Sequence, residues 1–121
     1  MPSPITVHVV DDEKVIAQTV AMILNRVGFR ATAFFSGEES LEAAKSAPPA
    51  LLVTDVVMPG IDGIHLGIQF RKLYPACKIL LFSGQAATSG MLDEANKEGH
   101  YFEIVPKPIH PAELLAKLKE L

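Results

Sequence analysis

The chain has 121 residues, 49% of them apolar, and a formal net charge of −3. That length fits one domain with a sizeable hydrophobic core. Direct nucleic-acid binding is not expected, because the chain is slightly acidic and has no run of lysine or arginine. No stretch approaches the ~20 apolar residues of a membrane span. A single cysteine, Cys77, excludes an internal disulfide framework, and we expect a soluble cytoplasmic protein.

In the first half of the chain, segments typical of strands alternate with segments typical of helices. Apolar run 5–10 predicts a strand, and a helix is expected from about Glu13 to Val27. The buried face of that helix is expected to carry Ile16, Val20, Ile23, Leu24 and Val27, with Gly28 ending it. A second short strand is expected over 30–35. The sequence Ser36-Gly37-Glu38-Glu39 then has the pattern of a capping box that opens a helix to about Ser46.

The same alternation continues to the end of the chain. Strands are predicted over 51–54, 78–82 and 101–105. A helix after the turn-rich segment 56–62 is expected to bury Ile64, Ile68 and Leu73. A weaker helix is expected over 87–98, interrupted at Ser89-Gly90, and a last helix begins at Pro111 with a stripe formed by Leu114, Leu115, Leu118 and Leu121. We expect residues 1–121 to form one domain with no output domain attached.

Nearly continuous apolar strands that alternate with helices are typical of a parallel sheet covered on both faces. In such α/β sheets the functional site lies beyond the carboxyl ends of the strands. The side chains that follow the predicted strands are Asp11 and Asp12, Asp55, Ser83 and Lys107. We therefore expect these five residues to meet at one edge of the sheet.

Three carboxylates at one sheet edge repel each other, by roughly 4 kcal/mol for a pair about 4 Å apart at an effective dielectric near 20. Such a cluster needs a cation, a raised pKa, or both. Carboxylate oxygens suit Mg²⁺, which proteins bind through one or two carboxylates together with a phosphate. Mn²⁺ is the alternative cation. With the hydroxyl of Ser83 and the ammonium of Lys107, the set has the groups needed to transfer a phosphoryl group to Asp55.

The chain resembles the receiver domains of two-component response regulators over nearly its whole length. Four motifs carry the resemblance, and they occur in order at the ends of the predicted strands: Val9-Val10-Asp11-Asp12-Glu13, Asp55 followed by Met58-Pro59-Gly60-Ile61-Asp62-Gly63, Phe82-Ser83-Gly84, and Lys107-Pro108. The resemblance implies a doubly wound, five-stranded parallel sheet with strand order 2-1-3-4-5 and helices on both faces.

The resemblance also implies a role for each site residue. Asp55 is expected to accept a phosphoryl group from a phosphohistidine on a histidine kinase or phosphotransfer protein. Asp12, Asp55 and the backbone carbonyl of Val57 are expected to bind Mg²⁺, with Asp11 acting mainly through a water molecule. Lys107 is expected to contact the phosphoryl group, and the peptide bond between Lys107 and Pro108 is expected to be cis.

Further expectations concern switching after phosphorylation. Ser83 is expected to move toward the phosphoryl group, and the small Gly84 leaves that group accessible. The resemblance places Val57 and Gln85 at positions where family members tune autodephosphorylation. Ile104 stands where the family usually has an aromatic switch residue, which is a departure from the usual serine–aromatic coupling.

Two alternatives remain open from the sequence. One is a receiver-like interaction module that is not phosphorylated, which Ile104 mildly favours. The other is a hydrolase with an aspartyl-phosphate intermediate, but such enzymes usually carry a second acid two residues after the nucleophile, where this chain has Val57. We therefore expect a phosphoacceptor rather than an enzyme. The kinase, the signal and the downstream partner do not follow from the sequence.

Overall fold

Five strands alternate with five helices along the part of the chain that this computed structural model describes, residues 4–84 and 89–120. The first half contains β1 (Thr6–Val10), α1 (Lys14–Arg26), β2 (Arg30–Phe34), α2 (Gly37–Ser46) and β3 (Leu51–Asp55). The second half contains α3 (Gly63–Leu73), β4 (Lys78–Ser83), α4 (Ser89–Lys97), β5 (Glu103–Pro106) and α5 (Pro111–Glu120). The element order matches the predicted alternation, and most ends differ from the prediction by one or two residues.

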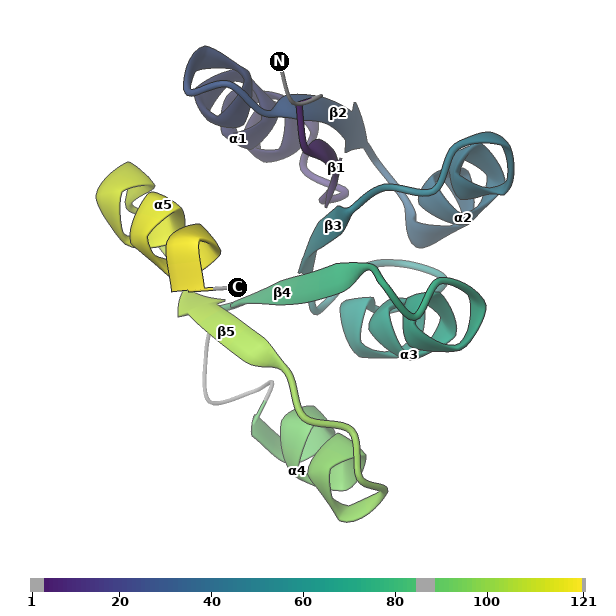
Figure 1. Ribbon diagram of the computed structural model, residues 1–121. Helices are drawn as coiled ribbons and strands as arrows, with labels where there is room; N and C mark the ends of the chain where they lie inside the picture. The colour runs from purple at the N-terminus through teal and green to yellow at the C-terminus, as the bar shows by residue number, and fades with distance from the viewer. Residues whose placement is uncertain (1–3, 85–88, 121) are drawn as a thin grey trace.

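All five strands are parallel and form one sheet in the order β2-β1-β3-β4-β5 (Figure 1). The predicted strand order is thus confirmed. β1 and β3 are neighbours, with Val10 opposite Thr54 in the register. β3 and β4 are neighbours with Asp55 opposite Phe82. Residues that follow β1, β3 and β4 are therefore brought to one edge of the sheet.

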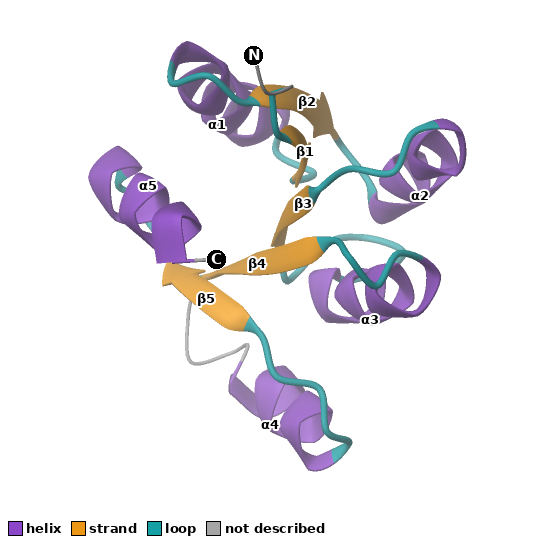
Figure 2. Cartoon of the chain, in the orientation of Figure 1, coloured by secondary structure: helices purple, strands orange, loops and turns teal. Residues whose placement is uncertain are grey.

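Helices cover both faces of the sheet: α1 and α5 lie on one face, and α2, α3 and α4 lie on the other (Figure 2). Each face has its own core. Val9 and Val53 pack toward α1 and α5, whereas Leu52 and Leu81 pack toward α2, α3 and α4. Strands buried on both faces explain the continuous apolar runs in the sequence.

The start of α2 shows why the capping pattern predicts a helix. Ser36 has extended backbone dihedrals, and its Oγ accepts a hydrogen bond from Glu39 N–H at 3.1 Å. The Glu39 carboxylate accepts in turn from Phe35 N–H at 2.9 Å, one residue before the N-cap. Polar backbone groups at the helix start are thus satisfied by side chains.

Three predictions about helix faces and ends are wrong in detail. Val27 lies beyond the last residue of α1 and is 51% exposed. Leu73 is 59% exposed, because the buried face of α3 instead carries Gly63, Leu66, Gly67 and Phe70, together with Ile64. Ser89-Gly90 does not interrupt α4 but forms its first two residues. The expected helical residues 87 and 88, and Leu121, lie outside the described part of the chain.

No helix in the described ranges is both long enough and apolar enough to span a bilayer.

Candidate functional site

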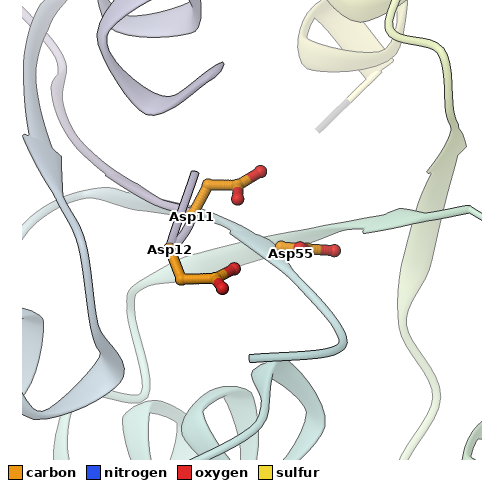
Figure 3. Close-up of side chains that lie close together, drawn as sticks. All are labelled: Asp11, Asp12 and Asp55. Carbon is orange, nitrogen blue, oxygen red and sulfur yellow. The ribbon is translucent and has the colours of Figure 1, made fainter. Parts of the chain in front are cut away.

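Three aspartates meet at the carboxyl edge of the sheet. Asp11 and Asp12 directly follow β1, and Asp55 is the last residue of β3. Because β1 and β3 are paired in parallel, their ends lie side by side. One carboxylate oxygen from each residue lies within 4.8 Å of the others (Figure 3). The structure thus brings together the acids that the sequence placed at this edge.

Asp11 is the most deeply buried of the three, with no exposed surface. Its Oδ1 accepts a hydrogen bond from Glu13 N–H at 2.9 Å. Its Oδ2 is buried without a hydrogen-bond partner among the described residues and lies 3.5 Å from the Lys107 ammonium. Burial, reinforced by the charges of Asp55 and Asp12, raises the pKa of Asp11, while the Glu13 N–H and Lys107 act in the opposite direction.

Asp55 and Asp12 differ in how open they are. Asp55 is 7% exposed, and its Oδ1 accepts a hydrogen bond from Val56 N–H at 2.8 Å. Its Oδ2 lies 3.1 Å from the ammonium of Lys107. The side chain of Asp12 is exposed at the mouth of the cluster. Asp12 is thus the member of the cluster that is most open to solvent.

Lys107 is positioned by its backbone as well as by its charge. Its N–H donates to the carbonyl of Ser83 at 3.0 Å, which ties the end of β5 to the end of β4. The peptide bond between Lys107 and Pro108 is cis. Burial lowers the pKa of Lys107, but its hydrogen bond to Asp55 and its charge interactions with Asp55 and Asp11 outweigh burial, and the net shift is upward. The ammonium is therefore charged at neutral pH.

The loop between β3 and α3 passes close to Asp55, and two residues that shape it were missed as functional candidates. Gly63 N–H donates to Val56 at 2.8 Å, and a Cβ on Gly63 would overlap the carbonyl oxygen of Asp55. Glu38, from α2, accepts a hydrogen bond from Ile61 N–H at 3.4 Å. The pair Asp62-Gly63 is typical of a turn in the sequence, and nothing there signals that a side chain would collide with the backbone of Asp55.

Of the five remaining candidates from the sequence, the structure describes Ser83, Gly84, Val57 and Ile104. Ser83 ends β4, the strand next to β3, and Gly84 lies against the Lys107 side chain, where a Cβ on this glycine would be 3.6 Å from the lysine Cδ. Val57 follows the strand by two residues and is 58% exposed. Ile104 is partly buried on β5, opposite Leu81, in the core beneath α3 and α4. Gln85 lies outside the described residues.

The donor set fits a small hard cation such as Mg²⁺. All the side-chain donors are carboxylate oxygens, which Mg²⁺ prefers. Lys107 supplies one positive charge against three carboxylates, so negative charge at the cluster stays unmatched. The Oδ2 of Asp11 accepts no hydrogen bond from the described residues, which is a further sign that their side chains alone do not satisfy the cluster.

Known proteins with similar sequences point to the same family as the geometry. The family model described as "Response regulator receiver domain" matches residues 7–119. The probable transcriptional regulatory protein TcrX of Mycobacterium tuberculosis is 30% identical over 98% of this chain and 50% of its own length. The response regulator receiver protein CpdR of Brucella abortus is 27% identical over 92% of this chain and 91% of its own length. The chain spans about half of TcrX and most of CpdR.

Solved structures agree on the fold. A putative response regulator from Chloroflexus aurantiacus has a TM-score of 0.83 at 30% identity, covering 98% of this chain and 97% of that one. A response regulator receiver domain protein from Clostridium thermocellum, 24% identical, has a TM-score of 0.84 over 96% of this chain and 92% of its own, and shows the fold alone. With the family model matched over almost the whole chain and the acids gathered at the edge of the sheet, this chain belongs to the receiver domains of two-component response regulators.

Proposed function

We propose that this receiver domain accepts a phosphoryl group on Asp55 from a phosphohistidine on a histidine kinase or histidine phosphotransfer protein. One observation carries the proposal: the Asp55 carboxylate lies 3.1 Å from Lys107, and one of its oxygens lies within 4.8 Å of an oxygen from each of two further carboxylates. A fold tolerates such repulsion most readily where the groups take part in chemistry.

In the proposed transfer, an Asp55 oxygen attacks the phosphorus atom and forms a P–O bond while the P–N bond of the phosphohistidine breaks. The electron pair of that bond leaves with the imidazole nitrogen. Val56 N–H orients the carboxylate through its 2.8 Å hydrogen bond to Oδ1. The Lys107 ammonium, already 3.1 Å from Oδ2, stays beside the oxygens of the incoming phosphoryl group and offsets their charge.

Asp12, Asp55 and the backbone carbonyl of Val57 are the proposed Mg²⁺ ligands, and Mn²⁺ has the same preference for oxygen. When bound, the ion would neutralise negative charge on the transferring phosphoryl group. Asp11 is proposed to act through a water molecule, because its Oδ2 has no hydrogen-bond partner among the described residues and retains acceptor capacity. Asp12, the exposed member, is the ligand most accessible from solvent.

The proposed switch begins when the phosphoryl group adds negative charge beside Ser83 and Lys107. Ser83 and Lys107 are already joined through the Ser83 carbonyl, so a movement of one end of the pair is transmitted to the other. Gly84 is proposed to keep the phosphoryl group accessible, and Val57 and Gln85 to tune its lifetime. Ile104 is partly buried on β5 and has an aliphatic side chain, so we propose that it cannot take the part of an aromatic switch residue.

Val57 also supports a phosphoacceptor over a hydrolase. An aliphatic side chain two residues after Asp55 can neither donate a proton nor orient a water molecule. The net charge of −3 likewise supports control of a downstream partner rather than direct contact with nucleic acid by this domain. Several relatives are named as transcriptional regulators, and an output of that kind is one form that such a partner can take.

The test is to incubate the protein with acetyl phosphate and Mg²⁺ and to measure its intact mass. We expect the mass of one phosphoryl group to be added, to require Mg²⁺, and to be absent from Asp55→Asn. Asp93→Asn, which changes an exposed acid on α4, is the matched control and should be labelled like the unaltered chain. A chain that takes no label at any donor concentration would support the unphosphorylated interaction module instead.

A further inference from the structure

A hollow of about 450 Å³ lies at the edge of the sheet opposite to the aspartates. It is lined by the last turns of α3, the start of β4 and the residues that lead into β5. All strands are parallel, so their amino ends lie here and their carboxyl ends lie at the aspartate cluster. None of the residues proposed for phosphoryl transfer lines this hollow.

Arg71 is fixed within the hollow by two contacts. Its guanidinium carbon lies 4.1 Å from the centre of the Phe102 ring, a stacked arrangement. One of its nitrogens donates to the carbonyl of Tyr101. A guanidinium has five N–H donors, and among the described residues the others have no acceptor. The planar fork is therefore oriented in advance with donors to spare.

The hollow is also positively charged within an acidic protein. Neither Arg71 nor Lys78 forms an ion pair within residues 4–84 and 89–120. The one carboxylate that lines the hollow, Glu103, forms an ion pair with Lys117 at 3.1 Å, and Lys117 also lies 3.7 Å from Glu120. Partial burial lowers the pKa of Arg71, because withdrawing an unpaired cation from water disfavours its charged form. An anion from solution would stabilise that form.

Aromatic surface lies beside these two cations. Tyr101 lines the hollow and is 65% exposed, so its ring is available to a ligand. Phe102 is turned inward: a Cβ on Gly67 of α3 would come within 2.8 Å of its ring. Because Gly67 has no side chain, Phe102 can pack against α3, and its ring lies beneath the guanidinium of Arg71. The floor of the hollow is formed in part by the buried Ile79.

We propose that this hollow binds a small aromatic anion, up to the size of a nucleoside monophosphate, with its oxyanion group on Arg71 and Lys78 and its ring beside Tyr101. The guanidinium fork matches the two oxygens of either a phosphate or a carboxylate. The volume lies within the range of small-molecule pockets. None of the residues that line the hollow belongs to the aspartate cluster, so the proposed binding does not require phosphorylation of Asp55.

The experiment is a titration of the ¹⁵N-labelled chain, followed by amide NMR shifts, with four probes in the absence of Mg²⁺. AMP carries a ring and a phosphate, and benzoate carries a ring and a carboxylate. Adenosine supplies the ring without the charge, and inorganic phosphate supplies the charge without a ring. We expect saturable shifts around residues 71–79 and 101–103 with AMP or benzoate, the tighter of the two identifying the oxyanion. Adenosine and phosphate should each bind more weakly.

Three variants sharpen the titration. Arg71→Gln should weaken binding about tenfold, because one charge-assisted, two-pronged contact is lost. Lys78→Gln changes an exposed side chain, leaves the Phe102 stack intact, and should weaken binding by a smaller factor of about three. Lys72→Gln, an exposed neighbour on α3 outside the hollow, is the control and should bind like the unaltered chain.

Four results would overturn the proposal. They are the lack of a saturable shift with either aromatic anion, shifts centred on Asp11, Asp55 and Lys107, affinity unaffected by Arg71→Gln and Lys78→Gln, and adenosine or phosphate binding as tightly as the better aromatic anion.

Discussion

Two buried polar side chains near the end of β1, His8 and Asp11, make the stability of the fold depend on pH in opposite directions. Burial raises the pKa of Asp11, so the folded chain holds that proton more tightly than the unfolded chain, and stability falls as pH rises above the ordinary pKa. Burial lowers the pKa of His8 to about 4. Between about 4 and 6.5 the unfolded chain binds the His8 proton more tightly, so stability falls as pH falls through that window.

His8 offers the cleaner test, because its partners are few. Its Nδ1 lies 2.8 Å from the Oγ of Ser40, and its ring packs on Phe34. Lowering the pH from 7.0 to 4.5 should remove about 2 to 3 kcal/mol of stability through His8. The double variant His8→Leu/Ser40→Ala removes the titrating ring without leaving the Ser40 hydroxyl unpaired. Between the same two pH values, its free energy of unfolding should fall by about 2 to 3 kcal/mol less than that of the unaltered chain, as measured by urea unfolding.

An exposed, uncharged side chain provides the control for that comparison: Gln18→Ala on α1 should show the same pH dependence as the unaltered chain. Equal losses of stability in the double variant and in the unaltered chain would mean that His8 does not titrate in this window.

At the scale of elements, the junction between β3 and α3 determines how Asp55 is presented. The chain reverses direction within a few residues, and Gly60 has a positive φ of 74°. Gly63 then brings the first turn of α3 against the backbone of Asp55 and Val56. The helix start is fixed by Asp62, whose side chain accepts from His65 N–H at 2.8 Å. The two glycines serve different needs: one allows the turn, and the other allows the close approach.

Two glycine-to-alanine substitutions should therefore have opposite effects. Gly63→Ala places a Cβ against backbone atoms that cannot yield, and should lower the free energy of unfolding by about 3 kcal/mol. Gly90→Ala, in the first turn of α4 with open space around it, should raise that free energy by up to about 1 kcal/mol. Urea unfolding measures both. Equal effects at the two positions would contradict the packing described for Gly63.

The order and type of these elements could be predicted from the sequence, but one buried face could be predicted only in part. The buried positions Gly63, Leu66, Gly67 and Phe70 of α3 follow helical spacing, yet two of the four are glycines, which carry no hydrophobic signal. The prediction assigned the face to Ile64, Ile68 and Leu73. Ile64 is buried and Ile68 packs against the core, but Leu73 is exposed. Packing against Phe102, from a segment 35 residues after Gly67, is what favours glycine there.

At the scale of the whole molecule, parallel strands turn four separate sequence motifs into one site. Because strand ends carry the motifs, knowing the element order was enough to predict that Asp11, Asp12, Asp55 and Lys107 would meet. The sequence could not predict that Lys107 would lie between Asp55 and Asp11, or that Asp11 would be fully buried with one oxygen that accepts no hydrogen bond from the described residues. Those features depend on side-chain positions that only the assembled sheet defines.

Unmatched negative charge at the cluster predicts that a divalent cation stabilises the fold. At a Mg²⁺ concentration ten times its dissociation constant, binding to the folded chain alone contributes about 1.4 kcal/mol and should raise the melting temperature. Asp12→Ala should abolish that rise, whereas Asp93→Asn on α4 should preserve it. KCl at matched ionic strength separates binding from screening. A rise that persists in Asp12→Ala would remove Asp12 from the cation site.

The proposed phosphoryl transfer requires that Asp55 itself becomes the acyl phosphate. The most direct measurement treats the acetyl phosphate-labelled chain with borohydride, which reduces an acyl phosphate to the alcohol, and then locates the altered residue by peptide mass spectrometry. We predict that Asp55 alone is converted to homoserine, and only when Mg²⁺ was present during labelling. Conversion of Asp11 or Asp12 instead, or of no aspartate in a chain that carries the added mass, would contradict the assignment of Asp55.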